Sequence, residues 1–569
     1  MAKIVKLKLQ NFRKFKDFTC DFGRTDLICL IGRGDSGKST ILDALSYVLS
    51  PSWSVQFSDY DFTDCNTTEP FRIIATIVDF PDELVRDDKF ALYMSGYNLN
   101  RHEVCDLEDE GAVDALVVEL TVDDSLEPKW TVLNALTGES KSISPHDRSL
   151  LNVNLISDYL NRHFAWANGS PLSSLTRLNG NGLNQEALVS IGRNIRDISS
   201  SASFGEFTDI LQGVQEAAAA FGVDTGTLHA EFDMRQLSVR EGAVCLHDKS
   251  RLPLRLRGKG SRRLLSAAIQ SSRSGESSIM LIDEVEQGLE PDRVRSFVHY
   301  LSNHHDGQVF LTTHSDNALV EVSASSVFWV RGGDSLYRCQ PEMQRLIRAN
   351  PAALFGNKIL LCEGETEYGF CRALDDFNVG SGGRSFSHCG TVAVVGRGSE
   401  FFRYADMYLD MGLSLLIFCD SDDKGENDQK ERLAQRGAKI VAWEQGQAFE
   451  HGVFSGIIAD GIRKLLLLAI ENKDDDEEVA KRSISDMVRS RCPAIGNTDI
   501  FSRDEYSADL RKALGDASKS KSGKGGAWFK SVSAGMEVGK IVCENYSALP
   551  EASLLKKNID KIIGWAGRD

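Results

Sequence analysis

A run of apolar residues that leads into a glycine-rich turn constrains this chain more than any other feature. Residues 28–31 read as a strand, and residues 32–40 have the sequence Gly-Arg-Gly-Asp-Ser-Gly-Lys-Ser-Thr, which fits G-x-x-x-x-G-K-[ST]. Residues 41–49 follow with the apolar spacing of a helix. A strand, a glycine-rich loop and a helix in this order are typical of a phosphate-binding P-loop, so we expect an α/β sheet built around a nucleotide.

Each part of this loop has a chemical role in holding ATP. Glycines let backbone N–H groups turn toward the phosphates, Lys38 brings a positive charge to the terminal phosphates, and Ser39 offers a hydroxyl to Mg²⁺. The residues expected to bind the nucleotide are Gly32, Gly34, Ser36, Gly37, Lys38, Ser39 and Thr40.

Composition excludes several classes of protein. A chain of 569 residues should form two or more domains, and 42% hydrophobic with 26% charged residues is typical of a soluble globular protein. The net charge of −17 argues against a uniformly basic nucleic-acid coat, but it leaves room for a local basic groove. The twelve cysteines are scattered without a C-x-x-C pair, so we expect reduced thiols in a cytoplasmic protein, and no run predicts a membrane span.

The N-terminal strand supplies the first resemblance to a known group of proteins. Residues 4–15 alternate as a strand that contains Asn11-Phe12-Arg13 ahead of the P-loop, and this start resembles the ABC-type ATPase heads of DNA-repair and chromosome-maintenance proteins. By analogy with those heads, the polar residues near Asp61 would lie in the loop that senses Mg²⁺ and the γ-phosphate. The tract 149–222 is expected to be a helical insertion that serves in dimerisation.

A basic segment further along the chain would complete the nucleotide site from a second copy. In ABC-type heads a Ser/Gly-rich turn before a helix binds the γ-phosphate of ATP held by the partner head. Gly258, Gly260 and Ser261 stand at that place, although the sequence is not L-S-G-G. An ordinary basic helix cap is the alternative interpretation.

Two buried strands then end in polar residues suited to ATP hydrolysis. The strand 279–282 ends in Asp283 and Glu284, which predicts that Asp283 holds Mg²⁺ and that Glu284 polarises the attacking water. Residues 308–313 form another apolar strand that runs into His314, the expected γ-phosphate sensor. The order of the four pieces favours an ATPase more strongly than any one piece.

The pattern restarts near residue 345, which divides the chain into an ATPase domain, 1–345, and a second domain, 346–569. Helical segments separate four apolar strands in the second domain, which predicts an α/β unit with a parallel sheet. Ligands bind at the carboxyl ends of such strands. The carboxylates that these strands would bring together there are Glu363, Glu367, Asp420 and Asp422.

Converging carboxylates repel one another unless a divalent cation neutralises them. Oxygen-only ligation suits Mg²⁺ or Mn²⁺, and metal ions that polarise a phosphodiester while activating water are typical of nucleases. A solvated acidic loop is the alternative for any one of these residues. The combination of E-G-x-T-E at 363–367 with D-x-D at 420–422, each after its own apolar strand, favours the metal site.

These motifs resemble the TOPRIM domain, and the whole chain resembles the OLD (overcoming lysogenization defect) family of ATP-dependent nucleases, which includes the Gabija nuclease subunit and some retron effectors. The resemblance implies cleavage of DNA, homodimers or larger assemblies, and either a helicase-like partner or a reverse transcriptase with its reverse-transcribed DNA. It also implies a carboxylate after the fourth strand, for which Glu450 fits better than Glu444, and a C-terminal lysine, for which Lys530 is chosen ahead of Lys524.

The sequence therefore predicts an ATP-regulated, metal-dependent DNA endonuclease that acts in bacterial antiphage defence. Its expected catalytic residues are Glu363, Glu367, Asp420, Asp422, Glu450 and Lys530, with Glu284 acting on ATP. The rival function is a non-nucleolytic ABC-type ATPase of DNA repair or maintenance, in which the acidic strand ends only position a structural Mg²⁺. A topoisomerase-like transesterase is disfavoured because no tyrosine has a recognisable setting for that chemistry.

Overall fold

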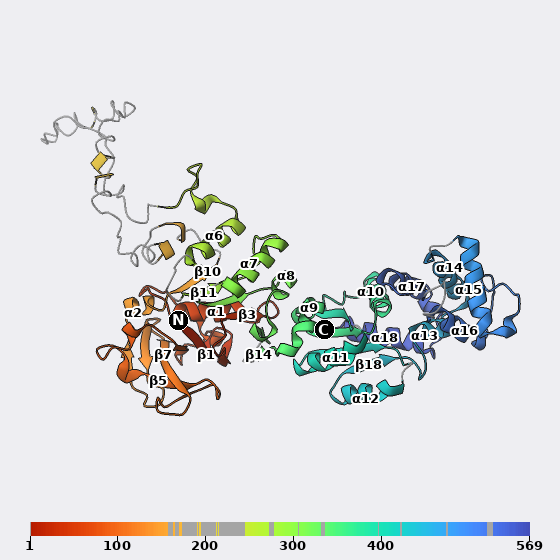
Figure 1. Ribbon diagram of the computed structural model, residues 1–569, viewed down its shortest axis with the longest axis horizontal. Coiled ribbons are helices and arrows are strands. Elements are labelled where there is room, and N and C mark those ends of the chain that lie inside the picture. The colour runs from red at the N-terminus through yellow and green to blue at the C-terminus, as the bar shows by residue number, and fades with distance from the viewer. Residues whose placement is uncertain are drawn as a thin grey trace. The chain divides into compact units, whose positions relative to one another are not determined.

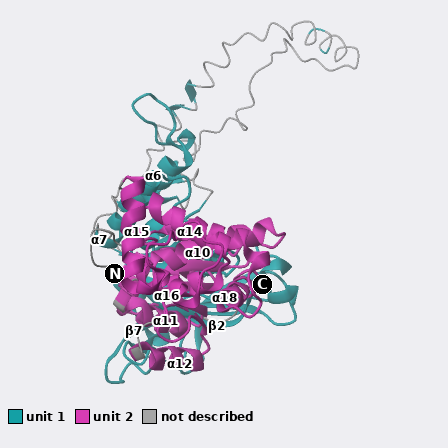
Figure 2. Ribbon diagram, turned by 90° about the vertical axis from the view of Figure 1, so that its right-hand side faces the viewer, with its two compact units in different colours: residues 1–322, 326–338 teal, residues 323–325, 339–569 magenta. Residues whose placement is uncertain are grey.

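The computed structural model divides into two compact units (Figures 1 and 2). The first comprises residues 1–322 and 326–338, and the second comprises residues 323–325 and 339–569. The domain boundary near residue 345 stays a prediction. The structure describes residues 2–157, 163–165, 170–172, 190–191, 193–194, 212, 214, 245–271, 278–304, 307–331, 336–396, 398–421, 424–473, 476–519 and 527–568.

A six-stranded sheet forms the centre of the first unit. Its order is β10-β11-β12-β3-β13-β14, in which only β14 is antiparallel to its neighbour. Every residue of β3 and β12 is buried, as the continuous apolar runs of a parallel sheet require. The bounds are β3 Leu27–Ile31, β10 Val153–Ile156, β11 Ser278–Ile282, β12 Gly307–Thr312, β13 Val327–Val330 and β14 Leu336–Arg338.

An antiparallel sheet accompanies it in the same unit. Strands β2-β1-β4-β7-β5-β6 lie in that order, and β8 and β9 extend the sheet from β7. The buried side chain of Gln308, on β12, joins the two sheets, since it accepts from the Ile4 N–H at 2.8 Å and donates to the Ile4 carbonyl at 3.0 Å. The bounds are β1 Lys3–Phe12, β2 Phe15–Asp21, β4 Phe71–Val78, β5 Ser95–Asn98, β6 Glu103–Cys105, β7 Ala112–Val122, β8 Pro128–Leu133 and β9 Ser140–Ser142.

Helices connect the strands of the first unit. They are α1 Lys38–Val48, α2 Pro145–Ser149, α6 Lys259–Ser271, α7 Pro291–His304 and α8 Asp316–Leu319. Helix α1 begins directly after the P-loop, as its apolar spacing predicts. The tract 149–222 was predicted to be helical, but residues 153–156 form strand β10 beside β11, so the prediction is wrong there. Most of the rest of the tract lies outside the described residues, so its helical character and its role in dimerisation stay predictions.

A four-stranded parallel sheet organises the second unit. Its order is β16-β15-β17-β18, so the first strand in the chain, β15, lies inside the sheet beside β17. Because both strands run in the same direction, their carboxyl ends lie at one edge, which brings residues 363 and 420 together. The bounds are β15 Lys358–Cys362, β16 Thr391–Val395, β17 Ser414–Cys419 and β18 Lys439–Ala442.

Helices cover this sheet and continue past it to the C-terminus. They are α9 Gln344–Ala349, α10 Glu365–Gly380, α11 Phe401–Asp410, α12 Asn427–Gln435, α13 Phe449–Gly456, α14 Ala459–Glu471, α15 Glu477–Arg491, α16 Ala508–Lys519, α17 Val532–Glu544 and α18 Leu554–Ala566. One buried core runs from strand β15 to helix α18, so the later helices belong to the same unit as the sheet.

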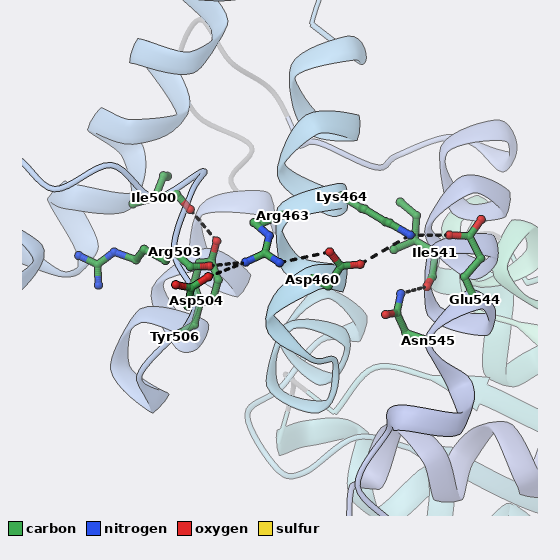
Figure 3. A network of polar contacts seen from close by, with 10 residues as sticks. All are labelled: Asp460, Arg463, Lys464, Ile500, Arg503, Asp504, Tyr506, Ile541, Glu544 and Asn545. Atoms are coloured by element: carbon green, nitrogen blue, oxygen red, sulfur yellow. Dashed lines mark hydrogen bonds and ion pairs between the residues drawn. The ribbon is translucent and has the colours of Figure 1, made fainter.

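Polar contacts fix helix α14 between two neighbouring segments (Figure 3). On one side, Arg463 donates to the carbonyl of Arg503 at 2.8 Å. On the other side, Lys464 pairs with Glu544 of α17 at 2.8 Å. Within the described residues, no helix is both long and apolar enough to cross a membrane.

Candidate nucleotide and metal sites

Two glycines shape the P-loop for steric reasons. A Cβ on Gly32 would lie 2.5 Å from the carbonyl oxygen of Val330, and its φ is +147°. Gly37 has φ +105°, and a Cβ there would lie 2.5 Å from the ring of Phe15. Gly34 has open space, so the structure gives no steric reason for glycine at that position. The positive φ values and these close contacts explain why glycine stands at both positions of the loop.

Lys38 lies buried at the start of α1 with its ammonium turned onto the loop. Its Nζ donates to the carbonyls of Gly32 at 2.9 Å and Arg33 at 2.8 Å. Burial lowers the pKa of Lys38 to about 8, although nearby carboxylates oppose the shift. Nucleotide phosphates would offer this ammonium stronger acceptors than two neutral carbonyls.

The loop also holds a hydroxyl that is ready for a ligand. Ser36 is buried, and within the described residues its Oγ has no hydrogen-bond partner. Buried polar atoms normally have partners, so this orphaned hydroxyl fits a loop built to enclose phosphate oxygens. The neighbouring Thr40 lies half-buried in the first turn of α1.

The structure brings together the two residues predicted to hold Mg²⁺ beside ATP. Ser39 Oγ donates to Asp283 Oδ1 at 3.0 Å across a separation of 244 residues. Thr312, at the end of β12, donates its hydroxyl to the same oxygen at 2.7 Å. A hydroxyl and a carboxylate at this spacing are suitable ligands for Mg²⁺ next to a triphosphate.

Glu284, the residue predicted to polarise water, has a constrained backbone. Its φ is +49°, a left-handed conformation that is uncommon for glutamate. Its N–H donates to Thr312 Oγ1 at 2.7 Å, and its carbonyl accepts from the buried Arg263 at 2.9 Å. Arg263 also donates to the carbonyl of Asp283. The sequence places Arg263 only in a basic segment and gives no sign of these two backbone contacts.

The turn predicted to bind ATP in a second copy packs against its own unit. Gly260 lies in the first turn of α6, where a Cβ would lie 2.0 Å from the carbonyl oxygen of Gly288. Gly258 is exposed with open space, and Ser261 is half-buried. The role of Gly258, Gly260 and Ser261 toward a second nucleotide stays a prediction.

Burial lowers the pKa of His314, and the positive charge of nearby Lys38 lowers it further. Glu286 holds the segment, accepting from the His314 N–H and from Thr313 Oγ1, both at 2.7 Å. A neutral imidazole beside the P-loop lysine fits the predicted sensor role. Asp61 instead forms a 3.0 Å ion pair with Arg13, so its role near Mg²⁺ stays a prediction.

In the second unit, the ends of β15 and β17 place two predicted carboxylates side by side. The N–H of Asp420 donates to Glu363 Oε2 at 2.8 Å, and the N–H of Glu363 donates to the Phe418 carbonyl at 3.0 Å. Asp420 Oδ1 accepts from the N–H of Phe449 at the start of α13 at 2.7 Å. The backbone therefore orients both carboxylates.

Two further carboxylates lie within electrostatic reach. Burial and the charges of Glu450 and Glu363 raise the pKa of Glu367 to about 7. Burial and the charges of Glu367, Glu363 and Glu450 raise the pKa of Asp420 to about 8. Burial also raises the pKa of Glu450, against the attraction of Lys530. The structure thus gathers Glu363, Glu367, Asp420, Glu450 and Lys530 around one edge of the sheet.

The position of Lys530 depends on the E-G-x-T-E motif itself. Thr366 Oγ1 donates to the carbonyl of Phe529 at 2.8 Å, so the first turn of α10 holds the residue before the lysine. The packing of α10 on α17 is close, since a Cβ on Gly535 would lie 2.2 Å from the Thr366 carbonyl oxygen. The sequence analysis did not predict this role of Thr366, although Thr366 lies within the E-G-x-T-E motif.

The donor chemistry of this edge fits a hard divalent cation. Burial and neighbouring carboxylates raise the pKa values of Glu367, Asp420 and Glu450, so a cation would stabilise their charged forms. Oxygen ligands are those that Mg²⁺ and Mn²⁺ prefer. Within the described residues, however, no three His, Cys, Asp or Glu side chains are already arranged to hold a metal ion. Asp422 lies outside the described residues, as does the rejected Lys524.

Comparison with protein-family models finds three matches along the chain. Residues 2–129 match the AAA ATPase domain model AAA_15, and residues 143–321 match AAA_21, an AAA domain described with the AbiEii toxin of type IV TA systems. Residues 354–422 match the TOPRIM domain of overcoming lysogenization defect protein-like proteins. No curated protein matches the chain.

These matches define the class of protein as an ATPase joined to a TOPRIM domain. This is the domain order of the OLD family of ATPase and TOPRIM nucleases, as the sequence predicts. The predicted fold class, an ABC-type P-loop ATPase followed by a TOPRIM α/β domain, is confirmed. The rival function of an ATPase without a nuclease is not favoured.

Solved structures with some likeness include two Smc heads and RecF. An Smc head bound to the C-winged helix domain of ScpA is 13% identical with a TM-score of 0.34, and the alignment covers 59% of this chain and 98% of that one. An Smc head with an extended coiled coil, bound to ScpA from Pyrococcus furiosus, is 12% identical with a TM-score of 0.34, covering 61% and 98%. RecF with ATP is 12% identical with a TM-score of 0.32, covering 59% and 99%.

Proposed function

We propose that this protein is an ATP-regulated, divalent-metal-dependent DNA endonuclease. The observation that carries the proposal is the convergence of Glu363, Glu367, Asp420 and Glu450 at the carboxyl ends of β15 and β17. The match of residues 354–422 to an OLD-like TOPRIM domain supports it.

In the proposed cleavage reaction, the carboxylates would hold a cation and Lys530 would stabilise developing charge. A divalent cation bound there would polarise the phosphodiester and activate water. Glu363, Glu367 and Asp420, with Asp422 beyond the described residues, would hold it. Glu450 would extend the negative site, and Lys530 would stabilise the charge that develops on the leaving oxygen.

The first unit would couple the nuclease to nucleotide. Lys38, Ser39 and Asp283 would hold ATP with its Mg²⁺, and His314 would contact the γ-phosphate. Glu284 would polarise the attacking water, so hydrolysis is expected. The turn 258–261 of a second copy would complete the site in a homodimer or a larger assembly.

The biological setting belongs to the same proposal. We propose a role in bacterial antiphage defence because the OLD family contains such effectors. A helicase-like partner would make the system Gabija-like, and a reverse transcriptase with its DNA would make it retron-like. The identity of the neighbouring genes decides between these partners.

The test incubates supercoiled plasmid DNA with the protein and either Mg²⁺ or Mn²⁺, with and without ATP. We expect nicked or linear DNA that requires the metal and disappears with EDTA. The Glu363→Gln variant, purified in parallel, controls for contaminating nucleases and should leave the plasmid intact. Supercoiled DNA that persists in every wild-type reaction would overturn the proposal.

A further inference from the structure

A buried lysine lies beside the carboxylate edge without belonging to the set drawn from the motifs. Lys430 is on α12, in a segment where most side chains are exposed, yet it is only 7% exposed. Burying a lysine is costly unless its ammonium finds partners. The partners of Lys430 therefore indicate what the fold uses it for.

The main partner of Lys430 is the backbone of Asp420, one of the proposed metal ligands. Lys430 Nζ donates to the carbonyl oxygen of Asp420 at 2.5 Å and pairs with Glu426, the residue just before α12, at 3.5 Å. The Asp420 carbonyl belongs to the peptide bond that joins Asp420 to Ser421, the next residue of the D-x-D segment. A charge-assisted hydrogen bond here fixes the direction in which the chain leaves β17.

Other backbone groups of Asp420 and Ser421 also form hydrogen bonds. The Asp420 N–H donates to Glu363 at 2.8 Å, and Ser421 exchanges backbone bonds with the 446–447 turn, its N–H donating to Gln447 at 2.9 Å and its carbonyl accepting from Gly446 at 2.6 Å. Lys430 supplies the one side-chain contact in this set that comes from α12. The ammonium of Lys430 bonds to the backbone carbonyl of Asp420, and not to its carboxyl group.

We propose that Lys430 is a positioning residue that clamps the Asp420–Ser421 turn, so that the carboxylates bind their divalent cation tightly. This inference rests on the proposed function, because it assigns the cation to these carboxylates. Residues that orient metal ligands from outside the coordination shell typically change metal affinity by about 10- to 100-fold when they are replaced.

The test measures Mn²⁺ binding by the full chain with electron paramagnetic resonance, separately from plasmid cleavage. Lys430→Met keeps the length of the side chain but removes the donor. We expect it to raise the Mn²⁺ dissociation constant by about 10-fold. The Mn²⁺ concentration for half-maximal cleavage should rise by a similar factor, with cleavage at saturating Mn²⁺ largely retained. Lys430→Arg, which keeps a charged donor, should recover part of the affinity.

Two matched variants separate the clamp from general effects on α12. Glu426→Gln removes the ion pair to Lys430 but leaves the bond from Lys430 to Asp420. Arg432→Met, also on α12, removes an ion pair to Asp406 of α11. Both should bind Mn²⁺ as the wild type does, and thermal unfolding reports whether each variant folds. If Lys430→Met does not fold, Lys430→Arg and Glu426→Gln carry the comparison, and a loss of Mn²⁺ affinity in Glu426→Gln, which keeps the bond to Asp420, would refute the clamp.

Other outcomes separate this inference from the proposed function. Wild-type Mn²⁺ affinity in folded Lys430→Met overturns the clamp, while the nuclease function stands if the wild type cleaves DNA. Absence of both Mn²⁺ binding at these carboxylates and cleavage in the wild type would overturn the proposed function, and the clamp with it.

Discussion

The carboxyl groups of Asp420 and Glu367 should make the stability of the protein depend on pH, which can be measured without a substrate. Both carboxyl groups have pKa values raised by burial and by neighbouring carboxylates, to about 8 and about 7. In the unfolded chain their pKa values are about 4. Between these limits the native state binds more protons than the unfolded state, so the free energy of unfolding falls as pH rises.

The first prediction concerns metal-free protein. Stability contributed by these two groups should be present below about pH 4 and lost as pH rises through about 7 to 8. A divalent cation that replaces the protons should therefore raise the unfolding temperature more at pH 8.5 than at pH 6, values chosen on either side of about 7 to 8. Differential scanning calorimetry with EDTA or Mn²⁺ measures this.

Asp420→Asn is the control for the pH experiment, because it removes one titrating group while nearly keeping its shape. The pH dependence of the Mn²⁺ effect should become smaller in this variant. An effect of Mn²⁺ that is equal at both pH values in the wild type would show that the cation does not compete with these protons.

At this scale the sequence predicted which carboxylates lie near one another better than it predicted the contacts that hold them. Glu363, Glu367, Asp420 and Glu450 were identified from strand ends and from a resemblance, and the structure brings them together. Lys430 and Arg263 could not be predicted, because each acts through a backbone carbonyl that no spacing in the sequence indicates. Such contacts depend on how helices dock, which local patterns do not encode.

At the scale of elements, the packing of α10 on α17 determines where the C-terminal lysine lies. Gly369 and Gly535 let the two helices approach closely, since a Cβ on Gly369 would lie 2.1 Å from the Val532 carbonyl oxygen. Thr366 then reaches the Phe529 carbonyl next to Lys530. The parallel sheet of the second unit follows from apolar runs separated by helices. The close contact between α10 and α17 does not, because glycines in a helix also read as weak helix formers.

The second prediction tests this contact with two glycine variants. Gly535→Ala places a methyl group against a backbone carbonyl, so we expect it to destabilise the protein by about 1–3 kcal/mol in urea unfolding. Gly564→Ala in α18 has open space, so it should stabilise by roughly 0.5–1 kcal/mol through helix propensity. Equal stability of the two variants would contradict a close contact between α10 and α17.

At the scale of the whole molecule, two chemical sites lie in two compact units of one chain. Lys38, Ser39 and Asp283 form the proposed nucleotide site of the first, and the carboxylate edge lies in the second. The sequence predicted this division from the restart of the strand pattern. The predicted role of the tract 149–222 in dimerisation stays a prediction, because most of the tract lies outside the described residues.

Two substitutions in the full chain separate the sites. Lys38→Ala removes the ammonium that would meet the phosphates, so we expect loss of ATP binding with the carboxylate edge intact and Mn²⁺ binding unchanged. Asp420→Ala should leave ATP hydrolysis at the wild-type rate. A loss of Mn²⁺ binding in Lys38→Ala would contradict the assignment of the two sites to separate units.

The most direct measurement is the rate at which Asp420→Ala nicks supercoiled plasmid relative to the wild type, at saturating Mn²⁺ and with ATP hydrolysis measured on the same samples. The account predicts a fall in nicking on the order of 100-fold or more, since the variant loses a cation ligand, with hydrolysis unchanged. Equal nicking rates for the two proteins would contradict the claim that these carboxylates cleave DNA.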